Sequence, residues 1–234
     1  MWKRQLLFLC LAGLMAWSCW NEEVLPADAS TELPAEVKYI ALTFDDGPRR
    51  ETTGKLLDGL KARGASATFF LVGEQIAGNE DLVERMEAEG HQIGNHTWSH
   101  VRLDGASTEE AAQEVRMAEE ALRNTLGKGG YWLRPPYGII DEGVKTVVPM
   151  VKWSIDPRDW EKRNTEQVVH AVLQDAKPNG IVLLHDIYPS SVDAALQIVD
   201  ALQEEGYWFV TVEELLRLNG ISPQADVMYR SGKS

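Results

Sequence analysis

The chain has 234 residues, of which 44% are hydrophobic and 25% charged, and its formal net charge is -13 at pH 7. This length suits one domain with a complete hydrophobic core. The acidic balance argues against a nucleic acid partner, because phosphate binding needs clustered basic residues and the sequence has no basic stripe. Both cysteines, Cys10 and Cys19, stand near the N-terminus, so the rest of the chain has neither an internal disulfide nor a thiolate metal site.

The first residues predict export from the cell. Lys3 and Arg4 precede the apolar stretch QLLFLCLAGLMAW, an order typical of a secretory signal. The stretch is shorter than the roughly 20 residues that a transmembrane helix needs. Three fates of residues 1–20 stay open: cleavage after the A-x-A of ADAS at 27–30, lipid attachment at Cys19, or retention as an uncleaved anchor. We expect a protein of the bacterial envelope or the extracellular space, which meets the membrane only through this segment.

Residues 21–36 are predicted to form a polar tether, after which short apolar runs alternate with helical patterns. The runs that predict strands are 38–44, 67–72, 91–95, 131–133, 151–155, 181–184 and 207–212. The helical patterns between and after them cover 52–64, 80–90, 107–127, 165–177, 191–206 and 214–218. Ser107 precedes Glu110, and Thr211 precedes Glu214, at the spacing of a capping box, and Gly127 is expected to end the longest helix.

Strands that alternate with helices predict an α/β fold with a parallel sheet. Seven strands in a chain of this length favour a small β/α barrel over an open sheet. We expect a single catalytic domain over 37–220 and a flexible tail over 221–234. A monomer is expected.

Polar residues gather where the predicted strands end, and this end of a β/α barrel carries the catalytic groups. Five strands contribute to it: Asp45-Asp46, HTWSH at 96–100, RPPY at 134–137, DPRDW at 156–160, and His185-Asp186. Chance would scatter such residues over both ends, so their convergence predicts an active site. His91 begins a predicted strand and His170 lies within a predicted helix, and both are expected to lie outside the site.

The spacing of two histidines favours a metal site. His96 and His100 are four residues apart, and in a helical turn this spacing puts both imidazoles on one face. Alone, the pair fits a metal site and two ordinary surface histidines about equally well. A carboxylate of the same rim completes a ligand set that leaves positions for water and substrate. Asp45 and Asp46 then have separate uses, one as ligand and one as base, although DDGP is also common turn chemistry.

Arg134 and Tyr137 are candidates for positioning and for oxyanion binding. Arg134 can hold a carboxylate in its planar fork or form an ion pair with a structural role only. The two residues that follow it are prolines without an N–H group, so Tyr137 supplies the first backbone donor after Arg134. That N–H is a candidate for an oxyanion hole.

His185 follows the apolar stretch GIVLL and is a candidate general acid, although a lone histidine at such a position is more often part of the core. Asp156 or Asp159 would orient its ring, and the sequence does not choose between them. Trp160 would line a groove or pack into the core.

The residues of this rim resemble the polysaccharide deacetylase family with a NodB-homology domain, also called carbohydrate esterase family 4. The resemblance extends roughly over residues 37–218. The five motifs of that family occur in order: TFDDGP at 43–48, HTWSH at 96–100, RPPY at 134–137, DPRDW at 156–160 and LLH at 183–185. Five ordered motifs are far more specific than any single one.

The resemblance implies a distorted (β/α)7 barrel that removes acetyl groups from N-acetylated sugars with a divalent metal, usually zinc and sometimes cobalt. It also implies individual roles: Asp46, His96 and His100 as metal ligands, Asp45 as base positioned by Arg134, Tyr137 N–H as oxyanion donor, His185 as acid tuned by Asp159, and Leu183 with Trp160 as the wall of the acetyl pocket.

For an exported bacterial protein, the N-acetylglucosamine of peptidoglycan is the favoured substrate. N-acetylmuramic acid and chitin oligosaccharides are alternatives. An O-acetyl esterase of the acetylxylan type would use the same site. A catalytically inactive envelope protein is disfavoured, because Asp45 and His185 are both present.

Overall fold

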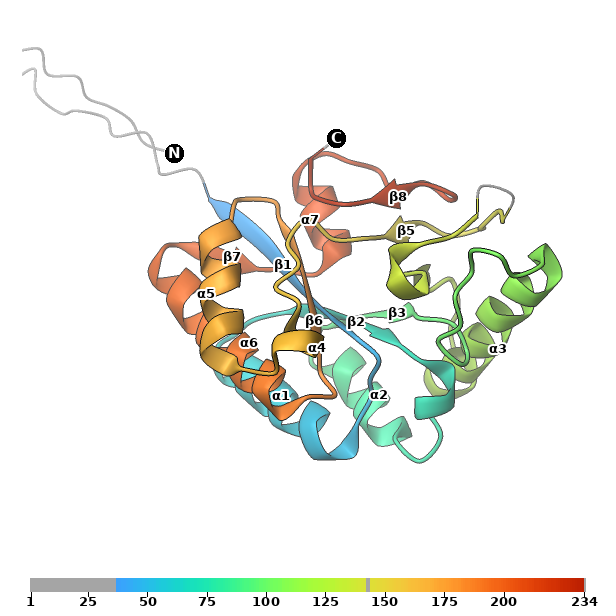
Figure 1. Ribbon diagram of the computed structural model, residues 1–234, viewed down its shortest axis with the longest axis horizontal. Coiled ribbons are helices and arrows are strands. Elements are labelled where there is room, and N and C mark those ends of the chain that lie inside the picture. The colour runs from blue at the N-terminus through green and yellow to red at the C-terminus, as the bar shows by residue number, and fades with distance from the viewer. Residues whose placement is uncertain (1–36, 142–143, 234) are drawn as a thin grey trace, which may run out of the picture. The chain divides into compact units, whose positions relative to one another are not determined.

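The computed structural model describes residues 37–141 and 144–233 (Figure 1). Parallel strands form its centre, in the order β6-β1-β2-β3-β4-β5-β8, and β7 pairs with the beginning of β1. The strands are β1 (Lys38–Asp45), β2 (Ala67–Leu71), β3 (Gln92–Asn95), β4 (Trp132–Leu133), β5 (Met150–Val151), β6 (Ile181–His185), β7 (Tyr207–Phe209) and β8 (Met228–Tyr229).

The sheet curls back on itself just after β5. Ile155 forms a parallel bridge with Val182 of β6, and Leu183 N–H donates to the Ile155 carbonyl at 3.0 Å. The segment that follows β5 therefore contacts β6 through a short irregular stretch instead of a full ladder. This confirms the predicted distorted (β/α)7 barrel.

Helices cover the outside of the sheet and connect successive strands (Figure 1). They are α1 (Arg50–Ala62), α2 (Glu80–Ala88), α3 (Thr108–Leu126), α4 (Asp159–Lys162), α5 (Thr165–Asp175), α6 (Pro189–Glu204) and α7 (Val212–Leu218), with 3-10 turns η1 (Gly73–Gln75) and η2 (Pro136–Gly138). Both predicted capping boxes form, at Ser107 with Glu110 and at Thr211 with Glu214. Gly127 ends α3 in the left-handed conformation, at φ 71°.

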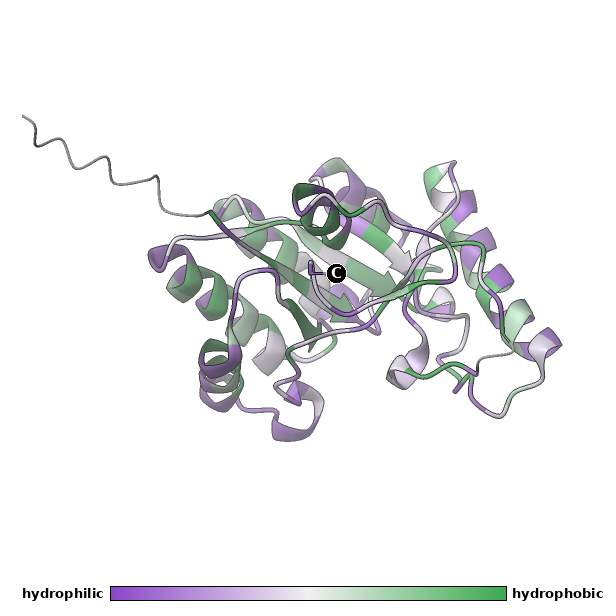
Figure 2. Cartoon of the chain, turned by 90° about the horizontal axis from the view of Figure 1, so that it is seen from above, coloured by the Kyte–Doolittle hydropathy of each residue, from purple (hydrophilic) through white to green (hydrophobic). Residues whose placement is uncertain are grey.

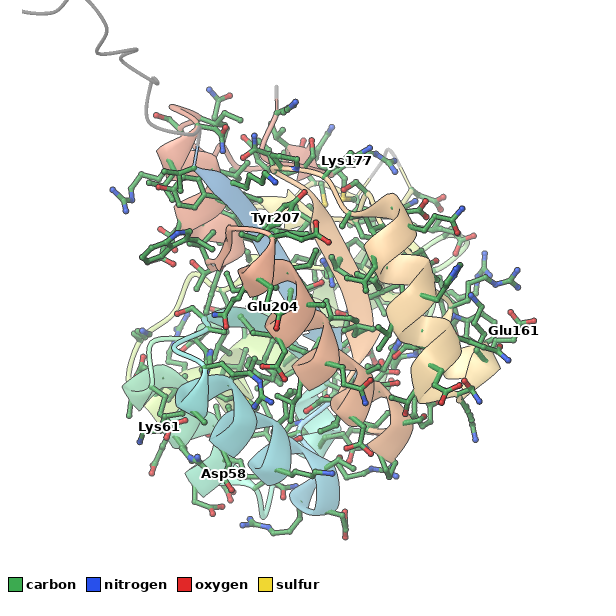
Figure 3. All side chains as sticks on the ribbon, turned by 90° about the vertical axis from the view of Figure 1, so that its left-hand side faces the viewer. Asp58, Lys61, Glu161, Lys177, Glu204 and Tyr207 are labelled. Carbon is green, nitrogen blue, oxygen red and sulfur yellow. The ribbon has the colours of Figure 1, made fainter. Side chains whose placement is uncertain are left out.

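The core lies between the sheet and these helices. β1 is buried from Ile40 onward, as expected of a parallel strand covered on both faces. Phe44 of β1 stacks on Phe69 of β2, with ring centroids 5.2 Å apart. Hydrophilic and hydrophobic stretches alternate along the outer helices in Figure 2. Figure 3 shows Asp58 and Lys61 of α1 at the surface, where they pair with Arg85 and Glu89 at 2.6 and 3.0 Å.

The end of the chain differs from the flexible tail that the sequence predicted. Met228 and Tyr229 form β8, a parallel strand beside Met150 and Val151 of β5. Strand β5 would otherwise be an open edge, and its amide groups find partners there.

The predicted signal segment, its cysteines and the tether fall in residues 1–36, outside the described residues. These predictions, and the domain limits drawn from them, stay predictions. Within 37–141 and 144–233, no helix is both long enough and apolar enough to cross a membrane.

Candidate active site

The five polar segments meet in one cavity of about 380 Å³ at the carboxyl ends of the strands. Most of the residues predicted from the motifs line it, together with Trp153 and Tyr188, which the sequence did not indicate. Arg134 and Asp159 are fully buried behind the lining, where they bind Asp45 and His185. Both are aromatic residues outside the motifs, and no local pattern distinguishes them from core residues. His91 lines a different hollow, at the beginning of β3, and His170 is exposed on α5. Neither belongs to the site.

Asp45 is the last residue of β1, and a buried arginine fixes its orientation. Arg134 is 0% exposed and its Nη1 donates to Asp45 Oδ1 at 2.7 Å. The same nitrogen donates to Thr43 Oγ1, and the carbonyl oxygens of Val151 and Lys152 accept from the other guanidinium nitrogens. A buried ion pair is tolerated only with such full hydrogen bonding. Asp45 therefore has one oxygen engaged by Arg134, while Oδ2 lies 3.6 Å from the ring of His96.

The protonation of His96 follows from its backbone partner. Its Nδ1 lies 2.7 Å from the Arg134 carbonyl oxygen, which can only accept, so Nδ1 carries the hydrogen. Nε2 is therefore the nitrogen that faces the cavity, 3.6 Å from both Asp45 Oδ2 and Asp46 Oδ1. Asp46 Oδ1 is buried and has no hydrogen-bond partner among the described residues. Two carboxylate oxygens and an imidazole nitrogen that make no hydrogen bond to one another in a buried site suit a bound cation.

Asp46, His96 and His100 are grouped closely enough to hold that cation. Their ligand atoms all lie within 4.8 Å of one another, and His100 Nε2 is 3.3 Å from Asp46 Oδ1. Two imidazole nitrogens and one carboxylate oxygen form a ligand set typical of catalytic zinc sites. The hydrogen bond from His96 Nδ1 to a carbonyl is the support that a ligating histidine usually has. The residues present therefore fit a divalent metal ion.

The expectation of a helical turn over 96–100 is wrong. The segment is a loop in which Thr97 and His100 adopt positive φ values of 68° and 58°. Its form depends on residues elsewhere: Asn95 Oδ1 accepts from Thr97 N–H at 2.8 Å, and Glu114 of α3 accepts from Ser99 N–H at 2.8 Å. These bonds bring the two imidazole centroids to 4.9 Å without a helix.

Tyr137 stands in an unusual backbone conformation beside the metal-ligand group. Its φ and ψ are 60° and 5°, inside the turn η2. Such a conformation is uncommon for a non-glycine residue and occurs often at functional sites. Within the described residues the Tyr137 N–H donates no hydrogen bond to the protein. Its side chain is 54% exposed, and the ring lies 5.1 Å from that of His100.

Asp159, and not Asp156, orients His185. Asp159 is buried at the beginning of α4, and its Oδ1 accepts from His185 Nδ1 at 2.8 Å. Its Oδ2 accepts from the His185 backbone N–H at 2.9 Å. Asp156 is exposed and accepts from the Arg158 N–H instead. Burial alone would lower the pKa of His185, but the hydrogen bond and charge of Asp159, with the charges of Asp45 and Asp46, raise it to about 9.

An apolar wall completes the cavity. Leu183 of β6 is almost fully buried and lines the space beside His185. Trp160 of α4 is 45% exposed and lies at the mouth, so it is not a core residue. A small apolar pocket next to a set of acids and histidines suits a short acyl group.

This combination of fold and site defines a β/α-barrel protein built for acid–base hydrolysis beside a possible metal site. The chain belongs to the polysaccharide deacetylase family, whose profile matches residues 32–151.

Relatives of known name support this assignment. The chain is 37% identical over 197 residues to the peptidoglycan-N-acetylmuramic acid deacetylase PdaC of Bacillus subtilis, covering 83% of this chain and 42% of the relative. It is 38% identical over 200 residues to the peptidoglycan-N-acetylglucosamine deacetylase PgdA of Listeria monocytogenes, covering 83% of this chain and 43% of the relative. The chain thus spans less than half the length of these two relatives.

Solved structures agree with the fold. The structure of PdaC superposes with a TM-score of 0.76 at 37% identity, covering 79% of this chain and 92% of that chain. A family 4 acetyl xylan esterase from Clostridium thermocellum, solved with a cobalt ion, gives a TM-score of 0.78 at 30% identity, covering 83% and 98%.

Proposed function

We propose that the chain is a metal-dependent hydrolase that removes N-acetyl groups from amino sugars of peptidoglycan, N-acetylglucosamine above all, and releases acetate. The observation that carries the proposal is the grouping of Asp46, His96 and His100, whose ligand atoms lie within 4.8 Å of one another, in the cavity that also holds Asp45 and His185. The similarity to deacetylases of peptidoglycan supports the substrate.

Asp46, His96 and His100 are the proposed metal ligands. When bound, a divalent cation would polarise the acetyl carbonyl and lower the pKa of a water. A ligand set of two histidines and one carboxylate suits zinc best and also accepts cobalt. The cobalt ion in the related esterase is consistent with this choice.

Asp45 is the proposed general base. Its Oδ1 is held by Arg134, so Oδ2 keeps a fixed direction toward the metal ligands and accepts the proton of the attacking water. Arg134 has no solvent exposure and binds four protein acceptors, which makes it a positioning residue for the base.

The Tyr137 N–H is proposed to act on the oxygen of the substrate amide, and His185 on its nitrogen. The Tyr137 N–H makes no hydrogen bond within the described residues, so it can donate to the oxyanion that forms from the acetyl oxygen. His185 is protonated at neutral pH because its pKa is raised to about 9, so it can give its Nε2 proton to the leaving amine. Leu183 and Trp160 would contact the acetyl methyl group and the sugar.

The place of action is also a proposal. The basic residues Lys3 and Arg4 before an apolar stretch support export to the bacterial envelope, where peptidoglycan is available. Cleavage, lipid attachment at Cys19 and retention as an anchor give products of different mass, which mass spectrometry of the mature protein distinguishes.

Acetate release tests the function. The purified protein is incubated with N-acetylglucosamine oligomers and with peptidoglycan, as isolated, after chelation, and after zinc or cobalt is added back. We expect release that stops on chelation and returns with the metal. Absence of release from both substrates, with metal bound, would overturn the proposal. Release from acetylated xylan alone would instead support the esterase function suggested by the likeness to the acetyl xylan esterase.

A further inference from the structure

Each tyrosine and tryptophan ring that lines the active-site cavity has a cationic side chain against it. The cavity contains two tyrosines and two tryptophans, which come from three of the connections that follow the strands. The distances from the cation to the ring centroid are 5.3 Å for Arg102 and Tyr137, 5.6 Å for Lys152 and Trp153, 5.8 Å for Arg158 and Trp160, and 4.5 Å for Arg163 and Tyr188.

These cations belong to a chain that is acidic as a whole. Lys and Arg number 23 against 36 Asp and Glu, so the protein as a whole repels anions. On the outer helices, basic side chains such as Arg63 pair with carboxylates. Arg163 and Lys152 pair with none among the described residues. The Arg163 Nε instead donates to the Trp160 carbonyl at 3.1 Å.

The backbone gives a second indication at the short helix α4. Arg158 and Arg163 flank it at its N-cap and C-cap, and both have a left-handed conformation, at φ 56° and 44°. This conformation is unfavourable for residues with a side chain, and it concentrates at ligand-binding and catalytic sites. Here it places two guanidinium groups against the two rings, Trp160 and Tyr188, on the His185 side of the cavity.

We propose that these rim cations, with Arg163 foremost, bind carboxylate groups of an acidic glycan, and that the enzyme therefore prefers acetylated sugars with carboxylates nearby to neutral polymers of the same sugar. This inference rests on the proposed deacetylase function and names the substrate class more closely. A guanidinium stacked on a ring keeps its N–H edge available, and that edge matches a carboxylate with two parallel hydrogen bonds. Stacking also restricts the side chain beforehand, which lowers the entropy lost on binding.

A neutral glycan gives no reason for the cations. Sugar rings need only the aromatic faces and hydrogen bonds, whereas an anionic polymer approaching a protein of charge -13 needs local positive charge at the cavity mouth. Arg102 and Arg158 are partly neutralised by Asp104 and Glu161, at 2.6 and 2.8 Å. Of the two unpaired cations, Lys152 is half-buried and has no planar fork, whereas Arg163 is exposed and has one, so Arg163 is expected to contribute most. Two carboxylate sources exist in peptidoglycan: the lactyl group of the muramic acid, and the peptide stems.

The test compares kcat/KM for acetate release from four soluble substrates. They are neutral N-acetylglucosamine oligomers, peptidoglycan fragments with free peptide carboxylates, the same fragments with these carboxylates capped as methylamides, and peptide-free glycan strands that keep the lactyl carboxylate. We expect the wild-type protein to favour one or both carboxylate substrates over the neutral and capped ones. Which of the two is favoured identifies the carboxylate source. The preference should weaken as sodium chloride rises, because exposed charges are screened.

The variant Arg163→Gln should lower the ratio of kcat/KM for carboxylate to capped substrate about fivefold, the size of one exposed ion pair. Arg217→Gln is the matched control, since Arg217 is exposed on α7 and lines the hollow of His91 instead of the cavity. The inference would be overturned if neither the free fragments nor the peptide-free strands were favoured over the capped and neutral substrates. The same ratio change in both variants would also overturn it. Calorimetric measurement of the binding of free and capped fragments distinguishes a failure of carboxylate recognition from a failure of the deacetylase function. Selective binding without acetate release would overturn the deacetylase function and leave the carboxylate recognition standing.

Discussion

In the helices around the barrel the residues suit the backbone conformation that they adopt, whereas several residues in the loops around the cavity do not. Helices α3 and α7 begin with complete capping boxes, and α3 ends at a left-handed glycine. The loops instead contain six non-glycine residues with positive φ: Asp46, Thr97, His100, Tyr137, Arg158 and Arg163. Only two further residues of this kind, Asn179 and Asp226, occur elsewhere in the described part of the chain.

In the loops around the cavity, tertiary contacts override the local preference of the backbone. A left-handed non-glycine residue costs about 1–2 kcal/mol, so the loops keep their form only because buried contacts hold them. Arg134 is one such contact, and the hydrogen bond from Thr53 to the buried Asp186 behind the Asp46 turn is another. Substitutions in the loops should therefore change activity or stability strongly, whereas substitutions on the outer helices should change stability slightly and activity not at all.

The largest effect is expected for Asp45→Asn. The amide cannot accept the proton of the attacking water, so kcat should fall by about 10²–10⁴. The proposed ligands Asp46, His96 and His100 are untouched, so zinc content measured by atomic absorption should stay near that of the wild type. A variant that kept most of its activity would show that Asp45 is not the base.

Arg134→Met should lower the free energy of unfolding by more than the loss of an exposed ion pair would. Asp45 would keep its charge in the core without a partner, and losing one member of a buried pair costs about 3–5 kcal/mol in free energy of unfolding. Urea denaturation followed by circular dichroism measures this change. Arg134→Lys is the control, because it keeps the charge but cannot supply the four hydrogen bonds. A loss below about 1 kcal/mol for Arg134→Met would contradict the role assigned to the pair.

Asp159→Asn should move the pH profile. The raised pKa of His185, about 9, keeps the proton on the ring at neutral pH, and activity that needs this proton is lost as the pH rises through that pKa. A bound cation offsets the charges of Asp45 and Asp46, so the basic limb of kcat/KM is expected near or below pH 9. Without the Asp159 charge, burial lowers the pKa, and the limb should move down by more than about one pH unit. An unmoved limb would remove His185 from the acid role.

Gly47→Ala should show that the Asp46 turn is held from behind. A Cβ at Gly47 would lie 2.5 Å from Asp186 Oδ2 and 2.8 Å from its Cγ, and Asp186 is fully buried. Such overpacking costs about 1–3 kcal/mol. Gly54→Ala within α1 is the matched control, because its Cβ would meet only Leu82 at 3.9 Å. The control should gain about 0.5–1 kcal/mol from helix propensity, so a gain for both variants would contradict the contact.

Ser107→Ala should have the smallest effect. It removes the N-cap of α3, which costs about 1 kcal/mol in a typical helix. Helix α3 supports the 96–100 loop through Glu114 and the Val115 carbonyl, which lie about two turns beyond the N-cap, so kcat/KM should stay within twofold. A large drop in activity would show that α3 supports the 96–100 loop more strongly than the hydrogen bonds of Glu114 suggest.

All strands of the described residues except β8, all their helices except α4, and both capping boxes followed from the sequence, because they depend on residues close together in the chain. Hydrophobic spacing sets strand and helix, and the pairs Ser107 with Glu110 and Thr211 with Glu214 act over three residues. The position of the polar residues at one end of the barrel could also be predicted from the sequence, since all parallel strands end on the same side. The ordered motifs were sufficient for the family.

The tertiary structure decided what depends on distant partners. It selected Asp159 over Asp156, because only Asp159 reaches His185, 26 residues away. It made 96–100 a loop, in which Glu114 of α3 accepts from the Ser99 N–H. The strand at Met228–Tyr229 exists because β5 offers an open edge, and Trp153 and Tyr188 face the cavity because of where the barrel closes. Sequence patterns record each residue's local surroundings, whereas these contacts join segments that only the folded barrel brings together.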